Sequence, residues 1–170
     1  MRRLAIVCSA LLLLIAGCGQ TPAPAAGPNA GESPKSAATP AVAVERYDLA
    51  RDEERGGHTL KKHVGRTDEQ LQERLRRERI SAASTWTDRE TAETTVAEAL
   101  RAERRRIDGW MRRGYPRANL ALHYGAGRSI GRSLQRGEEQ TVNCTSAVIV
   151  LRADGPDRFY VLTTYPEARE

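Results

Sequence analysis

Cysteine is scarce in this sequence of 170 residues, which contains three. Cys8 and Cys18 lie at the N-terminus, so Cys144 stands alone in the rest of the chain. A single thiol excludes a disulfide framework there. Because Cys144 lies within an apolar run with many β-branched residues, we expect a buried structural thiol rather than a nucleophile.

Aromatic residues are also few, at 5% of the chain, and Phe159 is the single phenylalanine. This content argues against a protein that stacks the bases of single-stranded nucleic acid on an aromatic platform. No spacing of histidine, cysteine and carboxylate side chains resembles a known zinc pattern. We therefore expect no metal and no other cofactor.

The apolar run Leu4–Ala16 is too short to span a bilayer, and two arginines precede it. This pattern predicts a secretory signal peptide over residues 1–17. The run ends in Ile-Ala-Gly-Cys at 15–18, which resembles the lipobox of bacterial lipoproteins. We expect acylated Cys18 to anchor the protein to a lipid bilayer of the bacterial cell envelope, at the outer membrane, the cell surface or the periplasm.

Residues 18–44 are rich in alanine, proline, glycine and serine and carry few charges. Such a segment cannot bury enough apolar surface to offset its ordering entropy, which predicts a disordered tether. Residues 45–170 remain as one folded domain, long enough for an independent core. The whole chain has a net charge of +5, which permits binding to nucleic acid or an acidic surface but establishes neither.

The first half of the domain has helical patterns. Thr67 and Gln70 form a capping-box pattern, which predicts a helix over 68–79 with Leu71 and Leu75 on its buried side. Residues 81–86 are expected to be a loop. A second, longer helix starts after Asp88, and its apolar positions recur at helical spacing as far as Met111.

The second half has strand patterns. Alternating residues predict a strand over 120–124, and a loop rich in glycine and arginine follows over 125–137. Two further strands, 141–152 and 158–165, flank a short turn and should pair as a hairpin. Helices first and strands later predict an α+β domain with an antiparallel sheet. We expect the protein to be a monomer.

The segment 56–65 contains His58 and His63 with Lys61 and Lys62 between them. Histidine exchanges protons near neutral pH, and the adjacent cations favour an anionic substrate. Two residues five apart face different ways on an ideal helix, so we expect a loop or an irregular turn here. A hydrogen-bonded structural role is the alternative for each histidine.

Three further side chains are candidates for the same site. Arg74 lies beside the buried stripe of its helix, and Thr163 and Tyr165 project from one face of the last strand. Periodicity alone favours solvated positions for all three. Their function therefore depends on what lies opposite them.

Six segments together resemble a known family, the ribonuclease A-like toxin domain of bacterial contact-dependent growth-inhibition proteins. The resemblance covers about residues 56–166 and rests on Gly-Gly-His-Thr-Leu at 56–60, His-Val-Gly at 63–65, the threonine-initiated helix with Leu71 and Arg74, Ser-Thr-Trp-Thr-Asp at 84–88, Gly-Arg-Ser-Ile-Gly at 127–131 and Tyr-Val-Leu-Thr-Thr-Tyr-Pro at 160–166. It implies a pancreatic-ribonuclease-like fold without disulfides, in agreement with the lone Cys144.

The resemblance implies catalytic roles for His63, Arg74, Thr163 and Tyr165, with His58 in a secondary or supporting role. The implied function is that of a metal-independent endoribonuclease. Such a protein would be a toxin, with RNA as its substrate and an immunity protein as its partner. The 2′-hydroxyl would attack the adjacent phosphate and leave a 2′,3′-cyclic phosphate. Four cations are expected to attract phosphates: Lys61, Lys62, Arg128 and Arg132. The alternative function is a non-catalytic envelope lipoprotein that binds an anionic ligand or a protein partner.

Overall fold

The computed structural model describes residues 46–168. The signal peptide expected over 1–17, the tether expected over 18–44 and the acylation site Cys18 lie outside the described residues. Within the described part, no helix is both long and apolar enough to cross a membrane.

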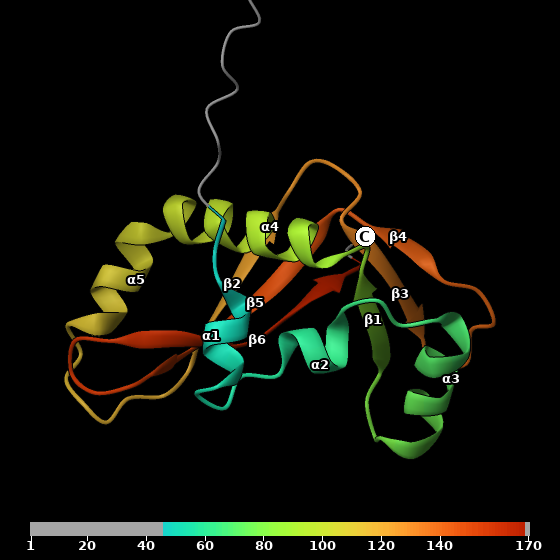
Figure 1. Ribbon diagram of the computed structural model, residues 1–170, viewed down its shortest axis with the longest axis horizontal. Helices are drawn as coiled ribbons and strands as arrows, with labels where there is room; N and C mark the ends of the chain where they lie inside the picture. The colour runs from blue at the N-terminus through green and yellow to red at the C-terminus, as the bar shows by residue number, and fades with distance from the viewer. Residues whose placement is uncertain (1–45, 169–170) are drawn as a thin grey trace, which may run out of the picture. The chain divides into compact units, whose positions relative to one another are not determined.

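Helices occupy the first half of the domain and most strands the second, which confirms the α+β class (Figure 1). The helices are α1 (Leu49–Glu53), α2 (Thr59–His63), α3 (Asp68–Arg77), α4 (Arg89–Ala102) and α5 (Arg104–Met111). The strands are β1 (Ala82–Trp86), β2 (Leu120–Gly125), β3 (Gly131–Gln135), β4 (Val142–Cys144), β5 (Ser146–Ala153) and β6 (Phe159–Glu167).

The strands form two antiparallel sheets of three strands each, in the orders β1-β3-β4 and β2-β5-β6. The expected hairpin is present as β5 and β6. The two sheets meet where β1 and β3 lie against β6. There the indole of Trp86, which is fully buried, donates a hydrogen bond of 3.1 Å to the carbonyl of Thr164.

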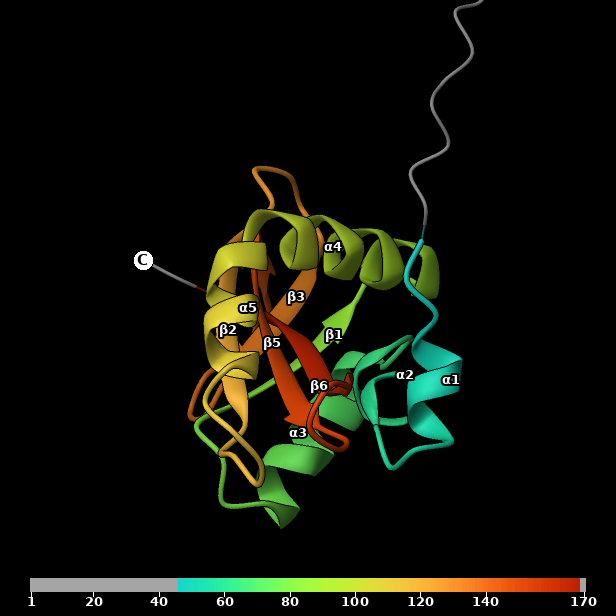
Figure 2. The ribbon, with the colours of Figure 1, turned by 90° about the vertical axis from the view of Figure 1, so that its left-hand side faces the viewer.

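The main core lies between α4, α5 and one face of β2-β5-β6. It contains Val96 and Ile107 from the helices and Leu122 and Ile149 from the strands. In Figure 1, β6 runs between α4 above it and α2 below it, and Figure 2 shows the same domain from its α5 side. Because neighbouring residues of a strand point to opposite faces, residues adjacent to the core positions face away from α4.

A second, smaller core joins α3 to the other sheet. Leu71 and Leu75 pack there with Ala83 of β1 and Leu134 of β3. Burying a leucine side chain contributes roughly 1.5–3 kcal/mol, so this pair holds α3 in place. The capping box predicted for Thr67 and Gln70 is present, with both reciprocal hydrogen bonds.

The first helix, α1, is attached to β6 through the buried carboxylate of Asp52. One of its oxygens accepts hydrogen bonds from the hydroxyl of Tyr47 at 2.7 Å and from the backbone N–H of Val161 at 2.6 Å. Burial is the main cause that raises the pKa of Asp52. The two donors offset part of the cost of removing this carboxyl from water.

Two of the expected loops contain strands. The loop expected over 81–86 contains β1, and the loop expected over 125–137 contains β3. The positions from Ala83 to Trp86 are all buried, so β1 shows no alternation of apolar and polar residues. Serine and threonine at the centre of β1 give it the composition of a loop, and only its pairing with β3 makes it a strand.

Two other elements that were expected to be continuous are each divided into two. The helix expected to continue from 88 to 111 breaks at Glu103 into α4 and α5. The strand expected over 141–152 divides at Thr145 into β4 and β5, which belong to different sheets. The thiol of Cys144 at this division is buried, as predicted, and burial raises its pKa to about 11.

Gly131 should be essential where β6 crosses β3. A Cβ atom at this position would lie 2.6 Å from Cγ of Pro166 and would also clash with the carbonyl oxygen of Thr85. We expect Gly131→Ala to lower the free energy of unfolding by about 1–3 kcal/mol. Urea denaturation followed by circular dichroism measures the change. Gly125→Ala is the control, because nothing lies within 4 Å of its Cβ position, and equal stability of the two variants would contradict the prediction.

Candidate active site

Helix α2 places the two histidines at its ends. It is a single turn that starts after His58 and ends with His63, so the expectation of a loop or irregular turn was wrong over 59–63. His58 precedes the helix with a non-helical φ of −151°, so the rotation of about 100° per residue in a helix does not apply to it. As a result the two rings lie on the same side, with centroids 6.4 Å apart.

Two hydrogen bonds attach α2 to β6. The backbone N–H of His58 donates to the carbonyl of Leu162 at 3.0 Å, and the backbone N–H of Thr164 donates to Oγ1 of Thr59 at 3.0 Å. Leu162 is the extra residue of a β-bulge, because Val161 and Thr163 pair with consecutive residues of β5. The bulge frees the Leu162 carbonyl for α2.

His63 is buried and has one ring nitrogen within reach of two partners. Its Nδ1 lies 3.4 Å from the carbonyl oxygen of Ser84 and 3.4 Å from Nη1 of Arg74. The carbonyl can only accept and the guanidinium can only donate, so the tautomer of His63 decides which of the two bonds to Nδ1. In the tautomer protonated on Nδ1, the ring donates to Ser84 and Nε2 is the acceptor. Burial, followed by the charge of Arg74, lowers the pKa of His63 to about 3. The imidazole is therefore neutral at physiological pH and able to accept a proton.

Arg74 reaches His63 from α3. Its Nε donates to Oε2 of Glu78 at 3.1 Å, which orients the guanidinium along the edge of the helix. Leu71 and Leu75 are buried on the adjacent side. The position beside the buried stripe thus brings this cation to the site rather than to bulk solvent.

Residues of β6 lie opposite His63. The ring of Tyr165 lies 5.4 Å from that of His63, and burial, then Glu167, raises the pKa of the phenol. Oγ1 of Thr163 is buried and has no hydrogen-bond partner among residues 46–168. The intervening Thr164 is fully buried on the core side. The alternation predicted for this strand is therefore present, with two hydroxyls on the site face.

A cavity of about 590 Å³ joins these side chains. His58, His63, Arg74, Thr163 and Tyr165 all line it. The site thus combines a neutral imidazole, a fixed cation, a phenol and a hydroxyl that has no hydrogen-bond partner among the described residues. These groups suit proton transfer and binding of an anion. Within the described part of the chain, no group of three or more histidine, cysteine or carboxylate side chains is placed to hold a metal ion.

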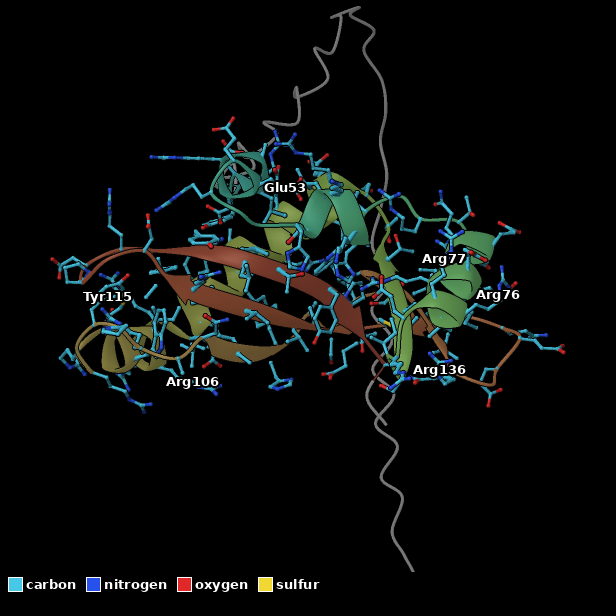
Figure 3. All side chains as sticks on the ribbon, turned by 90° about the horizontal axis from the view of Figure 1, so that it is seen from below. Glu53, Arg76, Arg77, Arg106, Tyr115 and Arg136 are labelled. Atoms are coloured by element: carbon cyan, nitrogen blue, oxygen red, sulfur yellow. The ribbon has the colours of Figure 1, made fainter. Side chains whose placement is uncertain are left out.

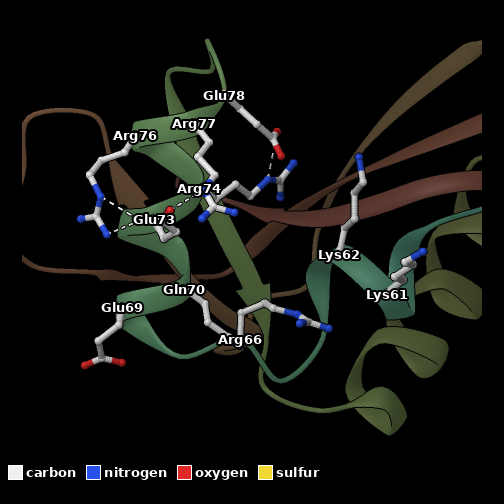
Figure 4. Close-up of a pocket in the computed structure, with 10 residues that line it drawn as sticks. All are labelled: Lys61, Lys62, Arg66, Glu69, Gln70, Glu73, Arg74, Arg76, Arg77 and Glu78. Atoms are coloured by element: carbon white, nitrogen blue, oxygen red, sulfur yellow. Dashed lines mark hydrogen bonds and ion pairs between the residues drawn. The ribbon is translucent and has the colours of Figure 1, made fainter.

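The other four candidate residues lie outside this cavity. Lys61 and Lys62 line a neighbouring cavity that also includes Arg74 (Figure 4). The structure does not bring Arg128 and Arg132 to either cavity. Arg128 pairs with Glu98 at 3.0 Å, and Arg132 pairs with Asp68 at 2.7 Å.

Sequence reasoning missed three contributors to the site. Ser84 supplies a carbonyl to His63, and Gln135 and Glu167 line the cavity. The first two lie in strands β1 and β3, which the sequence suggested were loops. A backbone carbonyl has no residue-type signature, so the family pattern around residue 84 was the only signal that pointed to it.

Known proteins provide two matches. The bacterial CdiA-CT RNAse A domain family matches residues 57–166. The crystal structure of a CdiA-CT/CdiI complex from Y. kristensenii 33638 contains a similar chain, with 31% sequence identity and a TM-score of 0.61. The similarity covers 66% of this chain and 100% of that chain. No curated protein sequence shows a significant match.

His63 should make the fold sensitive to acid. Its pKa is about 3 in the folded protein and near 6.5 when exposed, so as the pH falls the unfolded chain takes up the proton first. This linkage lowers the free energy of unfolding between about pH 6.5 and 3, by about 3 kcal/mol at about pH 4 relative to about pH 7.

Urea titrations of the domain and of His63→Gln across this pH range measure the contribution. The variant lacks the titrating ring, so its stability should fall less steeply towards acid. His123→Gln replaces an exposed histidine and should retain the steep wild-type dependence. Parallel stability curves for the domain and His63→Gln would contradict the assignment.

Proposed function

Because the chain belongs to the bacterial CdiA-CT RNAse A domain family, we propose that it is a metal-independent endoribonuclease and that it acts as a toxin. The family match supports the general class, a ribonuclease-type toxin domain. The observation that carries the proposal is the arrangement of His63, Arg74, Thr163 and Tyr165 around one cavity. The substrate we propose is RNA, which supplies its own nucleophile.

His63 carries out the first proton transfer. Its neutral ring accepts the proton of the 2′-hydroxyl, and the 2′-oxygen forms a bond to the adjacent phosphorus. General base catalysis of this kind contributes typically 10²–10⁴-fold. In the tautomer with its proton on Nδ1, hydrogen-bonded to the Ser84 carbonyl, Nε2 is the accepting atom. The low pKa of the imidazole keeps it unprotonated before the reaction.

The second proton transfer completes the cleavage. As the bond from phosphorus to the 5′-oxygen breaks, Tyr165 donates its phenolic proton to that oxygen. The products are a 2′,3′-cyclic phosphate and a free 5′-hydroxyl. The proton gained by His63 then leaves to solvent, and Tyr165 regains one from solvent. Burial of Tyr165 keeps the phenol protonated and ready to donate.

Arg74 and Thr163 bind the phosphate. The guanidinium of Arg74 stabilises the charge that builds up on the non-bridging oxygens. The hydroxyl of Thr163, which has no partner among the described residues, donates to a phosphate oxygen or to a base edge. His58 lines the same cavity, with its ring centroid 6.4 Å from that of His63, and has a supporting role.

We also propose an envelope location and a protein partner. The lipobox at residues 15–18 supports anchoring through acylated Cys18. The similar chain from Y. kristensenii 33638 was solved as a CdiA-CT/CdiI complex, which supports an immunity protein as the partner of this domain.

The purified domain 45–170 should cleave single-stranded RNA in the presence of EDTA. Mass spectrometry of the fragments should find 2′,3′-cyclic phosphate and 5′-hydroxyl ends. His63→Ala should reduce the rate by at least about 10²–10⁴-fold because the base is lost. Arg105→Ala, which replaces an exposed residue of α5, is the control and should cleave at the wild-type rate. RNA that stays intact with the folded wild-type domain would rule out this function.

The pH dependence should identify His63 as the base. Since kcat/KM reports groups in the free enzyme, activity should persist below the ordinary histidine range and fall only near the His63 pKa of about 3. In Arg74→Gln, the remaining activity should lose part of its acid tolerance, because the Arg74 charge is the second cause of the low pKa after burial. Arg77→Gln, whose arginine pairs with Glu73, should keep the wild-type profile. A wild-type acid limb near pH 6.5 would exclude this assignment.

A further inference from the structure

A second cavity of about 570 Å³ lies beside the catalytic one, between α2 and α3 (Figure 4). Arg74 lines both cavities, so they are contiguous at this residue. Six basic side chains line the second cavity, against three carboxylates, which leaves an excess of three positive charges. The basic residues are Lys61, Lys62, Arg66, Arg74, Arg76 and Arg77, and the carboxylates are Glu69, Glu73 and Glu78.

The carboxylates neutralise only one side of this cavity. Glu73 pairs with Arg76 and Arg77, and Glu78 pairs with Arg74. These five residues all belong to α3 or its end. The cations of that helix are therefore largely occupied within the helix itself.

The other side of the cavity carries cations without such pairing. Among residues 46–168, no carboxylate forms an ion pair with the side chains of Lys61, Lys62 or Arg66. Nε of Arg66 is also buried and has no hydrogen-bond partner in that range. A buried donor without a partner costs free energy, and a reorientation of this guanidinium towards an anion in the cavity would relieve that cost. Figure 4 shows Arg66 extended towards α2, which carries the two lysines.

We propose that Lys61, Lys62 and Arg66 form a second phosphate-binding site, which holds the phosphate of a nucleotide adjacent to the cleaved bond. This inference rests on the proposed ribonuclease function. A single RNA strand that places its scissile phosphate at Arg74 would continue past that residue into the second cavity. The guanidinium of Arg66 provides directed donors, and the lysines provide mobile point charges. Arg128 and Arg132, engaged by Glu98 and Asp68, make no part of this site.

Cleavage of long and minimal substrates tests the proposal. The variant Lys61→Ala/Arg66→Ala removes two charges from the site, and it spares Lys62, whose charge helps to lower the pKa of His63. The control Arg105→Ala/Arg113→Ala removes two exposed charges on or just after α5. That helix carries Arg106, which Figure 3 shows at the opposite end of the domain from Arg76 and Arg77.

The substrates are a mixed-sequence oligoribonucleotide and the full set of dinucleoside monophosphates. We expect the site variant to lose on the order of tenfold in kcat/KM on the oligoribonucleotide, as for loss of a charged hydrogen bond. The dependence of log(kcat/KM) on log[salt] should become shallower by about 0.7 for each phosphate that the variant no longer neutralises. Dinucleoside monophosphates contain only the scissile phosphate, so their cleavage should be unchanged. Arg66→Lys, which keeps the charge, should recover part of the loss.

Binding of a 2′-deoxy oligonucleotide, which lacks the nucleophile, is measured in parallel by fluorescence anisotropy. If the site variant binds more weakly and with less salt dependence than the control, the second site is supported. This holds even if the wild-type domain and its variants all leave RNA intact, and that combination would reject only the ribonuclease function. Equal binding by the two variants overturns the second site. So does an equal loss of cleavage on both substrate lengths. Circular dichroism melts confirm that each variant is folded.

Discussion

The attachment of α2 to β6 is the constraint on which the site depends. The bulge at Leu162 leaves its carbonyl free to accept a hydrogen bond from the backbone N–H of His58. Oγ1 of Thr59 accepts a hydrogen bond from the backbone N–H of Thr164. These bonds fix a single helical turn, which would not be stable alone because helix nucleation is costly. With α2 fixed in this way, His63 lies opposite Tyr165.

Arg74 acts on the site in two ways. It is the cation available to a phosphate, and its charge also helps to hold the pKa of His63 near 3. Loss of this side chain would therefore weaken substrate binding and change the protonation of the base together. The same residue borders the cavity formed with Lys62 and Arg66, so the reaction centre and the proposed second phosphate site share one guanidinium.

Local sequence signals predicted the elements that are defined by short-range chemistry. The capping box at Thr67, the β5–β6 hairpin and the face shared by Thr163 and Tyr165 follow from neighbours within a few residues. The strands β1 and β3 were missed because Ala83 and Leu134 owe their state to distant partners. The ion pairs of Arg128 and Arg132 could not be predicted from the sequence either, because their partners Glu98 and Asp68 are far from them along the chain.

The sequence by itself determined the class of the domain and the kinds of side chains available for its chemistry. Helix caps, strand alternation and the family pattern are encoded in residue order, and the family pattern also selected His63 over His58 as the base. Only the tertiary structure decided the state of these groups. Burial beneath β6 and the approach of Arg74 make His63 neutral, and burial leaves Oγ1 of Thr163 without a partner in the described range. Desolvation and charge proximity depend on three-dimensional distance, which residue order does not specify.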